Sequence, residues 1–399
     1  MNPRIAVTGI GCVCAQGLNG PEIMEAIYNR PALPRPPAMF DTTLREYPVF
    51  EVERITHRFL GQPLDPDSTT RSVRMAAQAL EEALRAAQLT PGVLKGRRTA
   101  ILMGTTVGVT LSDTAYYREY KDGKRPDIGP YVRFLRSNPS QALARLLGIP
   151  AFPFTVANAC ASSTDAIGLG RALLLAGLAD VAVAGGADEV CEINHTGFVS
   201  LMIHSKNPCR PFDLHRDGLN LGSGAGVLIL EREDEARRRG ARPEFFLTGY
   251  GTFLDGHHMT APHPEGRGLR NAILKALRES GIRPDELAFV NAHGTATKDN
   301  DQVEGGVFAG LLPPHIPVVS TKGYTGHTLG AAGAIEAALS IWALKRGSLM
   351  KSAGFETADP ACAILPNTAP KPLDKAHVLS TSLGFGGSNA ALVFKRERA

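Results

Sequence analysis

Several features that mark particular protein classes are missing from this sequence. Its six cysteines, at positions 12, 14, 160, 191, 209 and 362, include no Cys-x-x-Cys pair, so neither a zinc ribbon nor a thioredoxin-type redox motif is present. No uninterrupted apolar stretch approaches the roughly 20 residues that span a bilayer, and the first ten residues do not resemble a signal peptide. We therefore expect a cytoplasmic protein with reduced thiols and no membrane contact.

A long block of basic charge is also missing, although a local basic patch for an acidic partner remains open. The 43 basic and 39 acidic residues give a formal charge of +4, and no long basic block occurs. This balance gives no reason to expect a nucleic-acid partner. At 399 residues and 43% hydrophobic composition, the chain is long enough for two ordinary domains or one large duplicated one.

Sequence motifs for common cofactors are incomplete. The glycine-rich segment 383–389 is not followed by Gly-Lys-Ser/Thr, so it is not a phosphate-binding P-loop. Segment 9–14 lacks the third glycine of a dinucleotide fingerprint, and no acidic residue closes a βαβ unit. The four cysteines and histidines between positions 191 and 209 match no common metal-site spacing. We expect neither a cofactor nor a metal.

An internal repeat organises the chain. Three short apolar segments that end in glycine or small residues recur in the same order: 4–11 with 245–251, 100–105 with 289–295, and 224–232 with 387–396. Apolar residues at helical spacing occupy segments 68–87, 163–176, 269–280 and 331–345. Strands that alternate with helices indicate a layered α/β fold. We predict two similar halves, 1–240 and 241–399, with a polar insertion at 106–150 that contacts substrate or partner.

Three glycine-flanked segments each carry one reactive side chain. Cys160 follows a strand-like segment and precedes a helical one, and this context favours a nucleophile over a buried structural cysteine. The N–H groups at the start of a helix favour a thiolate. His293 and His327 stand in turns beside glycine, where sites are commonly built. Lys322 lies in an almost uncharged stretch, so burial would require a carboxylate partner, for which we expect Asp301 and Glu304.

These residues belong to a longer series of ordered motifs that resembles one family, the elongating β-ketoacyl-acyl-carrier-protein synthases, which are condensing enzymes of the thiolase fold. The resemblance covers nearly the whole chain. Its motifs lie at 7–11, 159–162, 185–187, 210–213, 216–218, 224–226, 258–260, 293–295, 321–322, 325–327, 330–333 and 384–387.

The resemblance implies a thiolase-like α/β fold with two duplicated halves in five layers, α-β-α-β-α. It implies that Cys160 accepts an acyl chain, while His293 and His327 assist decarboxylation of a malonyl thioester. The backbone N–H groups of Cys160 and Phe385 would form the oxyanion hole. Further implied roles are a polar network of Lys322 with Glu304 and Asp301, and contacts of Thr260, Thr295 and Thr297 with the pantetheine arm.

The implied partner is an acyl carrier protein, docked through Arg71, Arg74 and Lys206, and the implied assembly is a homodimer or a heterodimer with a chain-length factor. Thr106 and Val107 fall where the family lines its acyl tunnel. Departures from the family pattern, Ser223, Leu383 and a short loop at 206–210, bear on substrate.

Three functions stay open at this point. The first is elongation in fatty acid synthesis or a related pathway. The second is a ketosynthase of a type II polyketide or aryl-polyene pathway, and the third is a non-catalytic scaffold of the chain-length-factor type. The presence of Cys160 and both histidines argues against the third. A thiolase acting on coenzyme A thioesters would need a second cysteine in segment 384–388, which has none.

Overall fold

The computed structural model describes residues 3–65, 69–106 and 114–397. Within these residues, ten strands form one hydrogen-bonded sheet in the order β5-β4-β6-β7-β1-β8-β14-β13-β9-β10. The first half of the chain supplies β1 (Ile5–Cys14), β4 (Thr99–Gly104), β5 (Ala151–Val156), β6 (Val181–Asp188) and β7 (Gly224–Arg232). The second half supplies β8 (Phe245–Leu254), β9 (Leu287–Ala292), β10 (Val318–Ser320), β13 (His377–Gly384) and β14 (Ser388–Arg396).

The two halves repeat one strand order. Read outward from the centre of the sheet, the order is β1-β7-β6-β4-β5 in one half and β8-β14-β13-β9-β10 in the other. The three pairs of recurring sequence segments form the strand pairs β1 and β8, β4 and β9, and β7 and β14. Each pair occupies equivalent positions in the two halves, which confirms that the repeated segments are corresponding strands. Only two residue pairs, Ala6 with Phe246 and Val7 with Phe245, join β1 to β8. The division near residue 240 stays a prediction.

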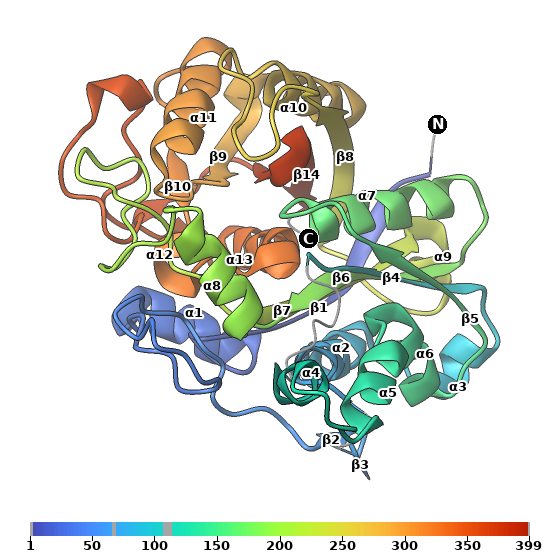
Figure 1. The fold of residues 1–399 in the computed structure, drawn as a ribbon. Coiled ribbons are helices and arrows are strands. Elements are labelled where there is room, and N and C mark those ends of the chain that lie inside the picture. The colour runs from blue at the N-terminus through green and yellow to red at the C-terminus, as the bar shows by residue number, and fades with distance from the viewer. Residues whose placement is uncertain (1–2, 66–68, 107–113, 398–399) are drawn as a thin grey trace.

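Helices separate the sheet into layers. On the outer face of the first half lie α2 (Arg71–Ala87) and α6 (Pro139–Leu147), and on that of the second half lie α10 (Arg267–Ser280) and α11 (Lys298–Leu311). Between the halves lie α7 (Ser162–Leu175) and α13 (Ala332–Arg346), each of which packs on strands of both halves. Figure 1 shows this order, with α13 near the centre of the molecule. The expected five-layered arrangement is confirmed, although the strands are hydrogen-bonded continuously.

The composition of each helix fits its layer. Helix α2 starts at an N-cap, Thr70, and buries one apolar face while its other face stays polar. Helix α13 is buried on nearly all sides, with 12 of its 15 residues buried, as a helix between two sheet layers must be. In α7, a Cβ at Gly168 would lie 2.3 Å from the ring of Tyr250, so only glycine allows β8 to approach this closely.

The described part of the 106–150 insertion forms short helices, and other short elements complete the fold. Within the described residues, no helix is long and apolar enough to cross a membrane. The insertion contains α4 (Thr114–Lys121), α5 (Gly129–Arg136) and α6, and the first two expose Tyr117, Tyr120 and Leu135. The remaining elements are α1 (Gly20–Asn29), α3 (Pro91–Lys95), α8 (Glu192–Ser200), α9 (Glu233–Arg238), α12 (Lys322–Thr325), β2 (Arg58–Phe59), β3 (Gln62–Pro63), β11 (Ser348–Leu349) and β12 (Lys371–Pro372).

Candidate active site

Cys160 lies in a tight turn between the end of β5 and the start of α7. Ala159, directly before it, has φ of +47°, a left-handed conformation that is unusual for a residue with a Cβ. The hydroxyl of Ser162 accepts the Asn158 N–H at 2.8 Å and donates to the Ala159 carbonyl at 2.5 Å, which holds the turn. The strand, turn and helix predicted from the sequence around Cys160 are therefore confirmed, and the cysteine is 4% exposed.

The thiol of Cys160 differs from the expected thiolate. Burial raises its pKa to about 11, because removing a thiolate from water is costly, while the charge of Lys322 and the Phe385 N–H act in the opposite direction. The expectation that the helix N-terminus would leave a resting thiolate is wrong, since desolvation of the enclosed sulfur outweighs these favourable groups. The resting nucleophile is a neutral thiol.

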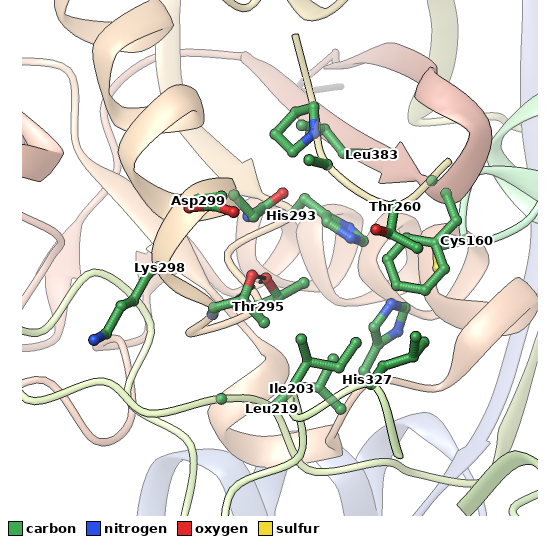
Figure 2. Close-up of a pocket in the computed structure, with 18 of the residues that line it drawn as sticks. Cys160, Ile203, Leu219, Thr260, His293, Thr295, Lys298, Asp299, His327 and Leu383 are labelled. Atoms are coloured by element: carbon green, nitrogen blue, oxygen red, sulfur yellow. Dashed lines mark hydrogen bonds between the residues drawn. The ribbon is translucent and has the colours of Figure 1, made fainter. Parts of the chain in front are cut away.

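His293 and His327 line the same cavity as Cys160, which has a volume of about 510 Å³. His293 directly follows β9, and His327 follows α12. Their ring centroids are 5.2 Å apart and the rings are inclined at 85°. Figure 2 shows both imidazoles on the side of the cavity where Cys160 lies. The structure thus brings together the three reactive residues that the sequence singled out.

The hydrogen bonds of the two histidines define where their protons lie. The ammonium of Lys322, which can only donate, is 3.0 Å from Nδ1 of His293. The backbone N–H of Leu329 donates to Nδ1 of His327 at 3.2 Å. Each ring therefore carries its proton on Nε2. Burial, followed by the charge of Lys322, lowers the pKa of both histidines well below 6.5, so both are neutral N–H donors.

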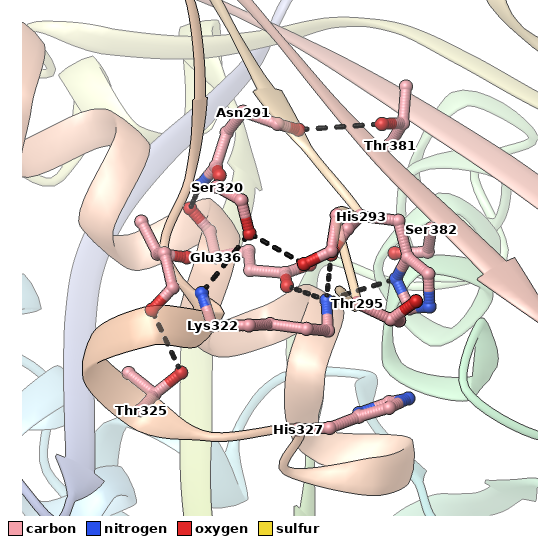
Figure 3. Close-up of polar contacts among 12 residues, drawn as sticks. Asn291, His293, Thr295, Ser320, Lys322, Thr325, His327, Glu336, Thr381 and Ser382 are labelled. Atoms are coloured by element: carbon pink, nitrogen blue, oxygen red, sulfur yellow. Dashed lines mark hydrogen bonds and ion pairs between the residues drawn. The ribbon is translucent and has the colours of Figure 1, made fainter. Parts of the chain in front are cut away.

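Lys322 is 1% exposed, and its carboxylate partner is Glu336 of α13. Its ammonium also donates to the His293 carbonyl at 2.6 Å, and Figure 3 shows these contacts together. The expected pairing with Asp301 and Glu304 is wrong, because α13 presents Glu336 to the ammonium from the central layer. A usable signal was present in the sequence, since Glu336 is the sole acidic residue of a helix whose other charges lie in its last turn.

The two carboxylates expected beside Lys322 instead support the His293 turn. Glu304 accepts the backbone N–H groups of His293 and Gly294, each at 2.7 Å. Asp301 accepts the N–H of Thr295 at 3.0 Å, along with three further backbone and side-chain donors. Burial raises the pKa of Glu304 to about 7. These residues fix the backbone from which the His293 ring projects.

Phe385, directly after β13, contributes both its backbone and its ring. Its N–H lies near enough to the Cys160 sulfur to lower the pKa of the thiol, a position that suits an oxyanion-hole donor. Its ring stacks on Phe198 of α8, with centroids 5.8 Å apart and planes inclined at 14°. Both rings and Leu383 line the cavity. Phe198 was not recognised from the sequence, because nothing in segment 192–200 distinguishes it from a core residue.

Of the residues expected to bind substrate, three line the cavity: Thr260, Thr295 and Thr297. The hydroxyls of Thr295 and Thr297 are 2.8 Å apart. Thr106 is not among the lining residues described; its N–H donates to Asp188 at 2.8 Å. Val107 lies outside the described residues. The acyl-tunnel role of this pair stays a prediction.

The three cations expected to dock a carrier protein differ in exposure. Arg71 donates to the Val52 carbonyl at 2.5 Å and lies 3.7 Å from the buried Glu189. Arg74 is 3.3 Å from His57. The Lys206 side chain is 57% exposed and lies near Glu46. Of the three cations, Lys206 is therefore the most exposed to solvent. Docking of a carrier protein stays a prediction.

Comparison with known proteins identifies the family. The model described as "Beta-ketoacyl synthase, N-terminal domain" matches residues 2–236, and "Beta-ketoacyl synthase, C-terminal domain" matches residues 245–356. The chain belongs to the β-ketoacyl synthase family. Members of this family are acyl-transferring condensing enzymes, and the thiol and two neutral histidines of this ketosynthase occupy one cavity.

Individual relatives of the ketosynthase come from two kinds of pathway. It is 34% identical to "Putative polyketide beta-ketoacyl synthase 1" of Streptomyces cyaneus over 98% of each chain. It is also 34% identical to "3-oxoacyl-[acyl-carrier-protein] synthase 2" of Staphylococcus aureus (strain COL) over 82% of each chain. Among solved structures, "The ishigamide ketosynthase/chain length factor" matches with a TM-score of 0.91 and 29% identity over the whole of both chains.

Proposed function

We propose that this ketosynthase joins an acyl group held on Cys160 to a malonyl group carried by an acyl carrier protein, and releases a β-ketoacyl carrier protein. The observation that carries the proposal is the cavity itself, in which a buried thiol is accompanied by two neutral imidazoles with protons on Nε2. Such donors can stabilise an enolate without a metal ion.

The reaction divides into two transfers. In the first, the Cys160 sulfur attacks the acyl thioester carbonyl, and the carrier thiol leaves with the proton. The N–H groups of Cys160 and Phe385 stabilise the oxyanion, at about 3 kcal/mol per donor. In the second, the malonyl carboxylate leaves as carbon dioxide, and its electron pair forms an enolate held by His293 and His327. The enolate carbon then bonds to the acyl carbon, and the cysteine sulfur leaves with the electron pair of the broken C–S bond and takes up a proton from water, which restores the neutral thiol.

Intact-mass spectrometry tests this division of labour. Incubation with acyl carrier thioesters of different chain length and unsaturation is expected to add one acyl group to Cys160, and malonyl carrier protein is then expected to discharge it as a product two carbons longer. The variant Cys160→Gln is expected to release carbon dioxide from malonyl carrier protein without condensation. If no donor forms an adduct with Cys160, the result would favour the non-catalytic scaffold instead.

A polyketide or polyene pathway is a second candidate beside fatty acid elongation. The polyketide relative aligns over 98% of each chain, whereas the 3-oxoacyl-[acyl-carrier-protein] synthase relative aligns over 82%. The ketosynthase/chain length factor structure aligns over the full length. The acyl donor preferred in the mass experiment distinguishes the two pathways.

Location in the cytoplasm stays a prediction.

A second subunit, identical or of the chain-length-factor type, is part of this proposal. Strand β5 is an edge of the sheet and exposes Phe152 (55%) and Phe154 (46%), an apolar edge that proteins normally cover. Sedimentation of the purified chain, with and without Phe152→Arg, tests whether this edge joins two copies. A monomer that forms no acyl adduct alone would direct the search to a different subunit.

Docking of the carrier protein is tested at Lys206. The change Lys206→Glu is expected to raise KM for carrier-bound substrates more than for small acyl thioesters, because only the carrier presents an acidic surface. Lys345→Glu, an exposed lysine at the end of α13, is the matched control. Equal effects on both substrate types would contradict the docking role.

A further inference from the structure

A chain of partly buried polar contacts joins the nucleophile turn to the second half of the protein. Ser388, the first residue of β14, donates to Oδ1 of Asn158 at 2.5 Å. The amide nitrogen of Asn158 donates to the carboxylate of Asp165, which lies on α7. The hydroxyl of Tyr250, on β8, donates to the other oxygen of Asp165 at 2.8 Å. Asp165 therefore receives donors from the turn before Cys160 and from a strand of the other half.

The surroundings of Asp165 are built for this contact. The residue is 8% exposed, and burial raises its pKa, while the donors Asn158 and Tyr250 lower it. Gly168, one turn further along α7, leaves the space that the Tyr250 ring fills. A buried carboxylate is costly unless it is hydrogen-bonded, and a helix with alanine at 168 would not admit the ring. Neither feature is needed for a helix that only packs.

Two adjacent members of this polar chain, Asn158 and Ser388, lie near the two oxyanion-hole donors in sequence. Asn158 is two residues before Cys160, and Ser388 is three residues after Phe385. A Cβ on Gly384 would be 3.1 Å from the Cys160 nitrogen, so β13 closes directly on the nucleophile turn. The Cys160 N–H belongs to the first half of the chain and the Phe385 N–H to the second. Their separation therefore depends on contacts between the halves.

We propose that Asp165 is a positioning residue, which through Asn158 and Tyr250 holds the Cys160 and Phe385 N–H groups at the separation that an acyl oxyanion requires. The proposal rests on the proposed function, because it concerns the acyl transfer to Cys160. Asp165 does not touch substrate. Its effect passes through the amide of Asn158 to the turn and, because Asn158 also accepts the Ser388 hydroxyl, to the loop of Phe385. Tyr250 fixes Asp165 itself to β8 of the second half.

The test compares two reactions of the same sulfur. Acyl transfer from a carrier thioester passes through an oxyanion, whereas alkylation by iodoacetamide is a direct displacement at carbon and forms none. For Asp165→Asn, Ser388→Ala and Tyr250→Phe, we expect acylation of Cys160 to slow by about 10- to 100-fold and alkylation to change by less than about threefold. Both rates are measured by intact mass on the full-length protein.

Thr248→Val is the matched control. Thr248 stands two residues before Tyr250 on β8, and its hydroxyl contacts Ser280 at 2.8 Å and the Val393 carbonyl at 3.1 Å, away from the nucleophile turn. The change Thr248→Val removes an interior hydroxyl hydrogen bond, as Tyr250→Phe does. We expect the acylation and alkylation rates of this control to stay at the wild-type value. Tyr250→Phe deletes one hydroxyl only, so it keeps the test informative if Asp165→Asn does not fold.

Three results would overturn the proposal: acylation that stays at the wild-type rate in all three variants, acylation and alkylation that fall together, or an equal loss in Thr248→Val. The wild-type protein distinguishes this failure from failure of the proposed function. If the wild type itself accepts no acyl group, the proposed function is wrong, whereas an active wild type with unaffected variants refutes only the role of Asp165.

Discussion

Replacing Lys322 by methionine would remove the contact that keeps the His293 proton on Nε2. The ammonium is the donor to Nδ1 of His293 at 3.0 Å and also contacts the His293 carbonyl at 2.6 Å. Without it, the proton can move to Nδ1 and leave Nε2 as an acceptor, which cannot stabilise an enolate. Loss of one such donor typically lowers kcat by about 10²- to 10³-fold.

The same change affects stability through Glu336. Removing one member of a buried ion pair typically costs about 3–5 kcal/mol. Burial already raises the pKa of Glu336 to about 7, and Lys322 opposes this rise. In Lys322→Met the carboxyl takes up a proton at neutral pH, so we expect a loss near the lower end of that range. The double variant Lys322→Met/Glu336→Gln removes both charges and is expected to regain part of the stability.

The assay separates chemistry from stability. Carbon dioxide release from malonyl carrier protein is measured in the Cys160→Gln background, and unfolding is followed by thermal denaturation. We expect the double variant to recover stability but not decarboxylation. Lys345→Met, the same substitution at an exposed position of α13, should change neither. Decarboxylation within about threefold of the parent in Lys322→Met would refute the tautomer argument, because a lost donor must cost more.

Three further predictions follow from burial. Burial lowers the pKa of His204 to about 4, so as the pH falls below 6.5 the imidazole is protonated in the unfolded chain before it is protonated in the folded one. Acid therefore destabilises the fold through this residue. His204→Gln should remove about 3 kcal/mol of the loss of stability between pH 6.5 and 4, measured by denaturant unfolding. Alkylation of Cys160 by iodoacetamide should keep accelerating above pH 9, and a plateau below pH 8 would contradict the resting thiol. Gly330→Ala would place a Cβ 2.4 Å from the Thr106 nitrogen and should lower stability by about 1–3 kcal/mol or more, whereas an unchanged melting temperature would show that this backbone can move.

Much of the fold was accessible from the sequence, because the repeat and the helical periodicity are local patterns. The segments echoed in the sequence became equivalent strands, and the four periodic segments became α2, α7, α10 and α13. The continuous hydrogen bonding from β1 to β8 was not accessible, since it depends on how the halves meet and involves only two residue pairs.

The site was predicted less evenly. Cys160, His293 and His327 stood out because each lies in a small-residue turn, and the structure brings them to one cavity. The partner of Lys322 was missed because the sequence does not show that the central helix α13 brings Glu336 to the Lys322 ammonium, although Glu336 is nearer in sequence than Asp301 or Glu304. The prediction of a thiolate at Cys160 was also wrong, since the sequence shows where the helix begins but not how completely the sulfur is buried.

The central helix layer has a consequence for how the chain folds. Helix α7 comes from the first half yet packs on β8 and β14, and α13 comes from the second half yet packs on β1, β6 and β7. Each half thus contributes its most apolar helix to packing against strands of the other half. A fragment ending near residue 240 would leave one side of α7 exposed to water. These contacts join residues far apart in sequence, which slows folding and makes it cooperative across the molecule. A chain built from two similar plans therefore acquires its structure as a single unit.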